Sequence, residues 1–434
     1  MRNSFMAVLT FLLGVSACQP VSRPLPATAQ LQDQCVQALT NVIVYDIFTP
    51  PVASRLYAYT QLAYYEALRP ANLQFASLLP QLRGFAALPA APDSNGCHFG
   101  LSAATAFLKV AEALVFSKDS MKVAGRRILQ PYDNLEAGVR QRSVAWGEAV
   151  AAVVLARAAA DNYKQTRGMP RYSVFKDAGR WTQTPPEYAD AVEPHWRLIA
   201  PLRMDSAAQC QPPPPPDYST DSSSRYYMEL REVYQVAAGL TAEQDSIAYY
   251  WDDNPFVVEH KGHFTMANKK ITPVGHWMGI AGILCGRYAQ GDAVKVAQVY
   301  ALTAAAIFDG FISCWYEKYK SRTVRPVTVI REWIAPTWEP RLQTPPFPEY
   351  TSGHSVISAA AEQVLTAAFG EVPFTDTTEM PYLGMQRTFA SARAASAEAG
   401  ISRLYGGIHF RAAIEAGKMQ GEQVGQLFVP LLRK

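Results

Sequence analysis

The sequence has few charged side chains for its length, and their charges nearly cancel. Asp, Glu, Lys and Arg make up 18% of the 434 residues, and the formal net charge is +3. A charge this close to neutral gives no basic surface for nucleic acid, so we expect no nucleic-acid partner. Hydrophobic residues make up 49% of the chain, which excludes a disordered protein and predicts a sizeable folded core.

Long hydrophobic runs are missing beyond the first residues, although a membrane-spanning helix needs ~20 apolar residues. The chain begins MRNSFMAVLTFLLGVSAC, a charged residue followed by an apolar stretch and small residues, which is typical of a secretory leader. Val15-Ser16-Ala17-Cys18 resembles a bacterial lipobox, so Cys18 is predicted to be acylated and to anchor an exported protein. Gln19 favours the outer membrane by resemblance to Gram-negative sorting rules. The alternative is an ordinary signal peptide.

Cysteine pairs typical of metal sites are also missing. No cysteine lies in a Cys-x-x-Cys motif, so a structural zinc site is not expected. Cys285 and Cys314 lie in apolar helical runs and are predicted to be buried thiols. A disulfide, if one forms, would join two of the three remaining cysteines after Cys18, which are Cys35, Cys97 and Cys210.

Strand-like alternation does not persist anywhere, whereas apolar residues recur at three- and four-residue spacing. We expect an all-α fold of helical bundles packed side by side. The segment 164–225 is rich in proline, with five consecutive prolines at 212–216, and is predicted to run extended over the surface. The predicted helices cover 34–48, 52–70, 99–117, 133–160, 226–252, 272–288, 292–322, 352–369, 385–402 and 410–431.

The predicted organisation has four parts. Residues 1–17 form a lipoprotein signal peptide and 18–33 an N-terminal linker. Residues 34–225 form an N-terminal helical region that includes the proline-rich segment, and 226–434 form a C-terminal helical catalytic region.

Three motifs in the C-terminal third predict one site that grips a tetrahedral oxyanion. Lys318 precedes Arg325 by seven residues, or two helical turns, so both cations can lie on one face of a helix. Pro326 is expected to end that helix nearby. Ser352-Gly353-His354 begins a helix, where a hydroxyl and unpaired backbone N–H groups favour an anion. Ser402-Arg403 is followed by His409 at the start of the last helix.

In this order and spacing, the motifs resemble the signature of the type 2 phosphatidic acid phosphatase/vanadium haloperoxidase superfamily, Lys-x6-Arg-Pro, Ser-Gly-His and Ser-Arg-x5-His. The resemblance implies a haloperoxidase/acid-phosphatase-like fold. It also implies that His354 is the general acid/base and that His409 bonds to vanadium or phosphorus. The vanadate or phosphate oxygens would be bound by Lys318, Arg325, Ser352, Gly353 and Arg403, and Lys318 would polarise the peroxide.

Two positions depart from the family pattern. Thr351 stands where proline is usual, a mild change at a helix cap. Ala413 stands where the family commonly has an aspartate that orients the second histidine, and Glu415 is poorly phased to replace it. This absence disfavours a phosphohistidine more than a bound vanadate.

Several features favour the haloperoxidase branch. The chain has a large N-terminal helical half, and segments 251–255 and 311–315 resemble bacterial haloperoxidase-like proteins of similar length. Trp315 lies one turn before Lys318 and is predicted to wall the pocket, where an aromatic ring suits a polarizable halide; ordinary core packing is the alternative. Asp252 and Asp253 could orient a pocket residue or cap a helix. His98, His195 and His276 are predicted to be structural.

The resulting hypothesis is an enzyme that oxidises iodide or bromide with hydrogen peroxide, using vanadate as its cofactor. The alternative is an acid phosphatase of the same superfamily, which would act on a phosphomonoester through a phosphohistidine and need no cofactor. The third is a phosphate-binding lipoprotein without catalysis. In each case the membrane is contacted only through the lipid anchor.

Overall fold

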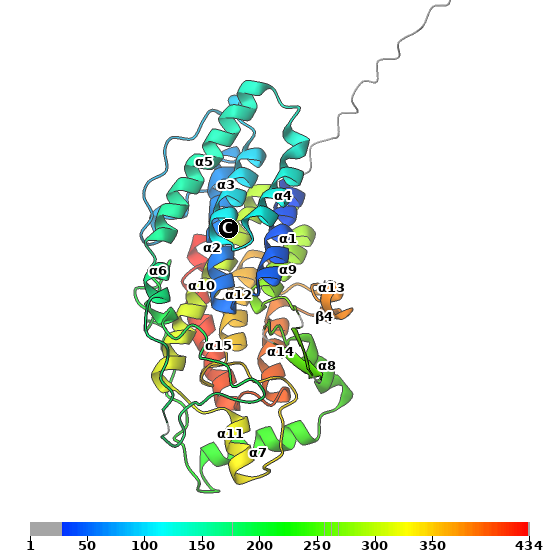
Figure 1. Ribbon diagram of the computed structural model, residues 1–434. Helices are drawn as coiled ribbons and strands as arrows, with labels where there is room; N and C mark the ends of the chain where they lie inside the picture. The colour runs from blue at the N-terminus through cyan, green and yellow to red at the C-terminus, as the bar shows by residue number, and fades with distance from the viewer. Residues whose placement is uncertain (1–27, 176, 256, 262, 268, 433–434) are drawn as a thin grey trace, which may run out of the picture.

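The computed structural model describes residues 28–432 except 176, 256, 262 and 268 (Figure 1). The predicted signal peptide and Cys18 lie outside these residues. The first helix begins at Thr28, inside the segment 18–33 that was expected to be a linker.

The described chain is mostly helical, which confirms the all-α class. The helices are α1 (Thr28–Asp46), α2 (Pro50–Leu68), α3 (Phe99–Leu114), α4 (Lys118–Leu129), α5 (Ala137–Ala159), α6 (Tyr163–Arg167), α7 (Arg225–Ala238), α8 (Ala242–Tyr250), α9 (Pro273–Tyr288), α10 (Ala293–Ser321), α11 (Pro326–Trp333), α12 (Gly353–Phe369), α13 (Met380–Leu383), α14 (Ala392–Tyr405) and α15 (Arg411–Gln426).

Two predicted helices are wrong in part. The expected helix over 226–252 is two helices, because Thr241 starts α8 with a capping box in which Gln244 bonds back to the cap. The expected helix over 385–402 begins only at Ala392. The strand β4 (Arg387–Phe389) precedes it and pairs with β3 (Phe374–Asp376). The helix α4 was not predicted.

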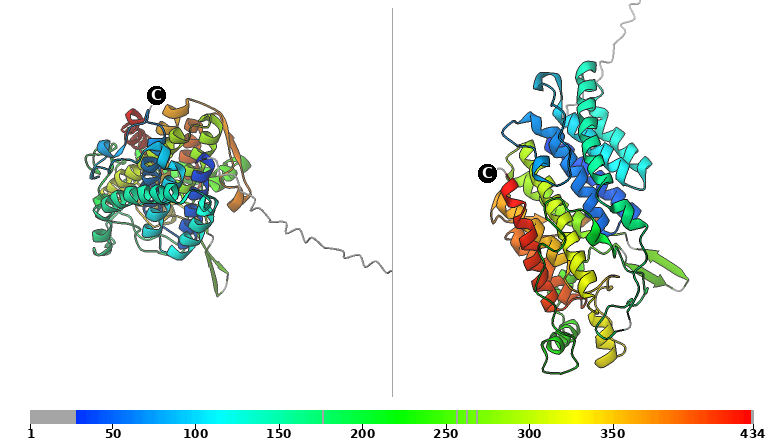
Figure 2. Two further views of the ribbon diagram at one scale, coloured as in Figure 1. Left: turned by 90° about the horizontal axis from the view of Figure 1, so that it is seen from above. Right: turned by 90° about the vertical axis from the view of Figure 1, so that its left-hand side faces the viewer.

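A second hairpin was also missed by the sequence analysis. Strands β1 (Val258–Lys261) and β2 (Phe264–Ala267) pair in antiparallel fashion and project from the helical body (Figure 2). Both hairpins are short, so they add local connections to the helical architecture rather than a layer of their own.

The helix α10 is the centre of the molecule. It packs against α2 on one side and α12 on the other, and one continuous apolar core runs from Leu31 to Leu431. By length and composition α10 passes for a membrane-spanning helix, yet its apolar window is entirely buried within the fold. It is therefore a core helix of the fold.

The proline-rich segment does more than cover the surface. Most of it lacks regular structure, but it contains the short helix α6 and a 3-10 turn at Trp196–Leu198, so it is not extended throughout as expected. Trp181 and Trp196 within it are fully buried. The carboxylate of Asp309 on α10 accepts bonds from three successive backbone N–H groups of this segment, at 2.7, 2.8 and 3.0 Å. The segment is thus fixed against the central helix, and the surface-only interpretation is wrong.

All five described cysteines are free and buried, including Cys285 and Cys314 as predicted. Hence no disulfide joins Cys35, Cys97 and Cys210 in the described residues.

A stripe of glycines brings α15 directly onto α12. Gly417, Gly421 and Gly425 follow one another at one-turn spacing. A Cβ atom at these positions would lie 2.9, 2.1 and 2.7 Å from the backbone oxygens of Ser352, Val356 and Ala360. Only glycine allows this approach, which places the residues just before α15 beside the start of α12.

This stripe generates a stability prediction. Gly421→Ala should lower the free energy of unfolding by at least about 1–3 kcal/mol, since the methyl group would overlap a backbone oxygen that no rotamer change can move. The control is Gly286→Ala at an exposed position of α9, where a Cβ meets nothing within 4 Å, and it should be neutral or stabilising by up to ~1 kcal/mol. Urea unfolding of both variants measures the difference; equal stabilities would contradict the packing role.

Candidate oxyanion site

The two cations of the first motif come from different helices. Lys318 lies in the last turn of α10, which ends at Ser321, and Arg325 is the N-cap residue of α11. Pro326 therefore begins a new helix instead of ending the first, and the expectation of one shared helix face is wrong. Both side chains are nevertheless fully buried and directed to the same region.

The second motif begins α12. Ser352 is the N-cap residue: its hydroxyl oxygen accepts bonds from the Ser355 N–H and hydroxyl groups, at 3.3 and 2.9 Å. Its own hydroxyl proton remains available for a ligand. The Gly353 and His354 N–H groups lie in the first helical turn, where the helix dipole favours negative charge.

The third motif joins α14 to α15. Arg403 lies buried in the last turn of α14 and donates to the Trp251 carbonyl and to Ser402 Oγ. His409 lies in the loop before α15. The Arg325 Nη1 atom is 3.2 Å from His409 Nε2, so the first and third motifs are in direct contact.

The buried cations are held mainly by neutral oxygens. Lys318 Nζ donates to the carbonyls of Pro348 and Glu349 at 2.9 and 3.0 Å. Arg325 donates to the carbonyls of Phe347 and Ile408, both at 2.9 Å. These dipoles orient the cations without cancelling their charge. Burial lowers the pKa of Lys318 to about 7 and that of Arg325 to about 10.

The tautomer of His409 is set by a carboxylate that the sequence analysis missed. Glu349 Oε1 lies 2.7 Å from His409 Nδ1 and also accepts the Phe410 N–H at 3.0 Å. With Nδ1 donating to Glu349, Nε2 carries the lone pair and faces the site. Burial raises the pKa of Glu349 to about 7, and burial and then Arg325 hold the pKa of His409 well below its usual range.

Glu349 also corrects the inference drawn from Ala413. The missing aspartate is replaced by a carboxylate from the loop before α12, while the Ala413 carbonyl accepts the Ser352 N–H at 3.0 Å. The departure at Ala413 therefore no longer disfavours a phosphohistidine. The available signal was a lone acidic residue in the apolar, proline-rich stretch directly before Ser352-Gly353-His354.

His354 faces the site from the first turn of α12. Its Nε2 atom has no hydrogen-bond partner among the described residues and lies 3.8 Å from Asp253 Oδ2. Burial, followed by the positive charge of Arg403, lowers the pKa of His354 to about 4. The ring is therefore neutral at ordinary pH and can accept a proton.

Of the motif residues, Gly353, His354, Arg403 and His409 line a small cavity of about 40 Å³, whereas Lys318, Arg325 and Ser352 lie outside its lining. Since a water molecule needs ~10–15 Å³ on the same measure, the space suits an ion of a few heavy atoms. The cavity is lined by Asp252, Asp253, Phe311, Trp315, Phe347, Gly353, His354, Arg403, Ile408 and His409, together with Pro50, Asn254, Pro255, Pro273 and Pro345. Lys318 and Arg325 are in contact with this lining.

Aromatic rings form one wall of the cavity. Trp315 lies 5.2 Å from Phe311 and 5.0 Å from Phe347 between ring centroids, and its Nε1 donates to the Val192 carbonyl. The Lys318 ammonium lies over Phe347 at 4.9 Å. The predicted wall position of Trp315 is thus where the structure places it.

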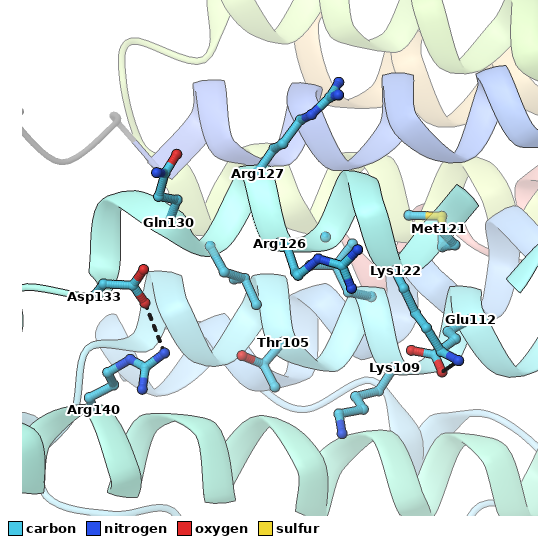
Figure 3. A pocket seen from close by; sticks show the side chains of 13 residues that line it. Thr105, Lys109, Glu112, Met121, Lys122, Arg126, Arg127, Gln130, Asp133 and Arg140 are labelled. Atoms are coloured by element: carbon cyan, nitrogen blue, oxygen red, sulfur yellow. Dashed lines mark hydrogen bonds and ion pairs between the residues drawn. The ribbon is translucent and has the colours of Figure 1, made fainter. Parts of the chain in front are cut away.

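A larger open cavity, of about 680 Å³, lies between α3, α4 and α5 (Figure 3). Its rim is basic, yet several of its cations are paired, such as Arg140 with Asp133 and Lys122 with Glu112. It contains none of the motif residues, so the chemistry-bearing site is the smaller cavity.

Comparison with known proteins places this geometry in context. Residues 298–434 match the family model for the VCPO second helical-bundle domain. The chain is similar to a solved bacterial vanadium-dependent iodoperoxidase at 43% identity and a TM-score of 0.89, covering 95% of this chain and 98% of that one. Comparison with curated proteins found no match.

Two further solved structures share the fold. The holo-type bacterial vanadium-dependent chloroperoxidase is 18% identical, with a TM-score of 0.68. The match covers 89% of this chain and 93% of the chloroperoxidase chain. The apo-type structure is 17% identical with a TM-score of 0.66, over 88% and 94%.

The charge balance of the site predicts pH-dependent anion binding. Sulfate remains a dianion at neutral pH, so a pH dependence of its affinity belongs to the protein. As the pH rises through about 7, Lys318 loses its proton and Glu349 gains a negative charge, and both changes weaken anion binding. Calorimetric titration from about pH 5.5 to 8.5 should show sulfate affinity falling with pH.

Two variants test the cause. Lys318→Met should bind sulfate more weakly at low pH and with a shallower pH dependence, because one titrating cation is gone. Lys320→Met removes the same charge from an exposed position paired with Glu317, and should resemble the wild type. A pH-independent affinity in the wild-type protein would contradict the assignment.

Proposed function

The chain belongs to the vanadium-dependent haloperoxidase family, and we propose that it oxidises iodide with hydrogen peroxide at a vanadate held by His409. The observation that carries the proposal is the convergence of three buried cations, held by hydrogen bonds to backbone carbonyls, around a neutral histidine nitrogen. Iodide is the proposed halide because the 43%-identical relative is an iodoperoxidase and because iodide is readily oxidised. Bromide is the next candidate.

The donor set fits vanadate. His409 Nε2 offers a lone pair to the metal, and Lys318, Arg325 and Arg403 offer N–H donors to anionic oxygens. Ser352 Oγ and the Gly353 N–H complete the donors at the helix start. When bound, vanadate(V) supplies a Lewis acid that activates hydrogen peroxide without a change of oxidation state.

Different residues of the cavity would transfer the proton and bind the halide. His354 is neutral and unpartnered at Nε2, so it is placed to take a proton from incoming peroxide and later return it to the product. Lys318 can donate to an oxygen next to the aromatic wall. The rings of Trp315 and Phe347 provide a dry, polarizable surface for a large halide.

A phosphatase would use the same pocket, with His409 as nucleophile and His354 as acid. Glu349 supplies the carboxylate that such a histidine needs, so the preference for the peroxidase is supported by the comparisons and by the aromatic wall. The phosphatase therefore serves as the opposing outcome in the activity test below.

We also propose that the protein is exported and anchored by an acylated Cys18. The support is the lipobox-like Val15-Ser16-Ala17-Cys18 after an apolar stretch. Two or three acyl chains would give durable attachment, at ~0.8 kcal/mol for each buried methylene.

Vanadate should have opposite effects on the two activities. Metal-free protein given peroxide and iodide should be inactive until vanadate is added, and phosphate should compete with vanadate for the cations. A phosphomonoester assay under the same titration is run in parallel. Phosphoester turnover abolished by vanadate, without halide oxidation at any vanadate concentration, would replace the peroxidase with the phosphatase.

Removing one cation of the site should weaken vanadate binding. Arg403→Gln is expected to raise the vanadate dissociation constant at least about tenfold, because a buried N–H donor to the anion is lost. Arg411→Gln removes the same charge two residues after His409, from a side chain paired with Glu232, and should change the constant less than about threefold. Equal effects would indicate a general loss of charge instead of a specific contact.

The anchor has a direct mass test. Intact-mass measurement of the membrane-fraction protein should show a chain that begins at Cys18 and carries added acyl mass, and Cys18→Ser should release the protein from that fraction. An unmodified chain cleaved elsewhere would contradict the anchor.

A further inference from the structure

A buried histidine outside the oxyanion motifs lies between two carboxylates. His276, on α9, places Nε2 at 2.8 Å from Asp376 Oδ2 at the end of β3. Its Nδ1 lies 3.1 Å from both oxygens of Asp253, in the loop after α8. All three side chains are buried, and the sequence analysis had assigned His276 a structural role only.

Both ring nitrogens of His276 face a carboxyl group, and the pKa of each of these carboxyls is held below its usual range, so both are ionised acceptors. A ring that donates to them from both nitrogens is doubly protonated, which makes His276 an imidazolium. Burial alone would lower the pKa of His276, but Asp253 and Asp376 hold it well above its usual range. In return, the imidazolium outweighs the effect of burial and keeps the pKa of Asp253 below its usual range.

The orientation of this ring is fixed by its neighbours. Trp251 stacks on it at 4.5 Å between centroids and 17°, and Tyr250 meets it edge-on at 5.4 Å. The Trp251 carbonyl accepts a bond from Arg403, so the same residue touches the oxyanion site. Asp253 has a φ of 40°, a backbone conformation that a non-glycine residue keeps only when the surroundings impose it.

The carboxylate that His276 holds is the one facing His354. Asp253 Oδ2 lies 3.8 Å from His354 Nε2, the atom without another partner. We propose that His276 is a positioning residue whose imidazolium keeps Asp253 ionised and directed at His354, so that His354 can accept a proton during turnover. This role rests on the proposed peroxidase function, in which His354 moves the proton.

The other groups around His276 are consistent with a single negative charge on Asp253. Glu379, at the start of α13, has Oε1 3.6 Å from His276 Nδ1. Burial and then Asp253 raise the pKa of Glu379 to about 9, so it stays protonated. The Tyr250 hydroxyl donates to the Asp376 carbonyl at 3.2 Å, and the positive charge of Arg403 acts on both His354 and Asp253.

The same cluster offers a competing occupant. One ligand atom each from Asp253, His276 and Glu379 lie within 4.8 Å of one another, so a divalent cation could replace the protons on His276 and Glu379. Metal analysis of the purified protein separates the two cases. About one equivalent of a divalent metal per chain, lost in His276→Gln, would overturn the proposal.

The protonation of His276 can be measured without activity or vanadate. In ¹⁵N-histidine-labelled protein, both ring nitrogens of His276 should give the signals of a protonated imidazolium from about pH 5 to 8. A neutral ring, or a ring that titrates in this range, would overturn the proposal even if the protein proves to be an active peroxidase.

Kinetics then test the positioning role. His276→Gln should lower kcat for iodide oxidation at least about tenfold with KM for iodide changed less than about twofold. The loss should grow as the pH falls, because Asp253 without the imidazolium takes up a proton. A loss of the same size at every pH, or a loss confined to KM, would indicate a purely structural role and overturn the proposal.

Two further variants guard against misfolding. Asp376→Asn keeps an acceptor for His276 Nε2 but weakens the charge, so it should show a smaller loss with the same pH trend. His98→Gln replaces a histidine whose Nδ1 accepts the Leu101 N–H at the start of α3, and should leave the pH profile unchanged. If wild-type protein with vanadate oxidises no halide, the proposed function fails while the nitrogen signals still decide the state of His276.

Discussion

The structure depends on the cost of burying three cations that make no direct ion pair with the described residues. Lys318, Arg325 and Arg403 are removed from water and receive mainly backbone carbonyls in exchange. The carboxylate of Glu349, which contacts His409, accepts bonds from the ring and from a backbone N–H. Burying these cations costs desolvation free energy. A bound anion would offset part of that cost, because it would pair with the buried positive charges. Affinity for an oxyanion is therefore built into the fold.

That arrangement needs rigid supports, and they come from distant parts of the chain. The loop before α12 supplies backbone carbonyls to Lys318 and Arg325. The glycine stripe of α15 sets the distance between the first turn of α12, which carries His354, and the loop that carries His409. The proline-rich segment is bonded to α10 through Asp309, and its Val192 carbonyl holds the Trp315 ring in the pocket wall.

The all-α class and most helices follow from residue spacing, because buried helices impose their period on the sequence. The oxyanion residues could be proposed because three short motifs, each next to a helix end, carry them. Glu349 and His276 could not be assigned from sequence. Glu349 acts on His409, 60 residues away, and His276 contacts Asp253 and Asp376, which lie 23 and 100 residues away. A single Glu or His shows no periodic pattern from which such contacts could be predicted. The break between α7 and α8 was missed because Thr241 and Gln244 form a cap that a continuous apolar pattern hides.

The burial of every described cysteine has a consequence for an enzyme that releases an electrophilic halogen species. Thiolates react fastest with such oxidants, and the thiolate form is what burial suppresses. Burial raises the pKa of Cys210 to about 11 and also raises that of Cys314, which lies behind the pocket beside Thr351. The product can therefore leave the cavity without meeting a reactive thiol. The hydrophobic core thus also serves as protection against the enzyme's own chemistry.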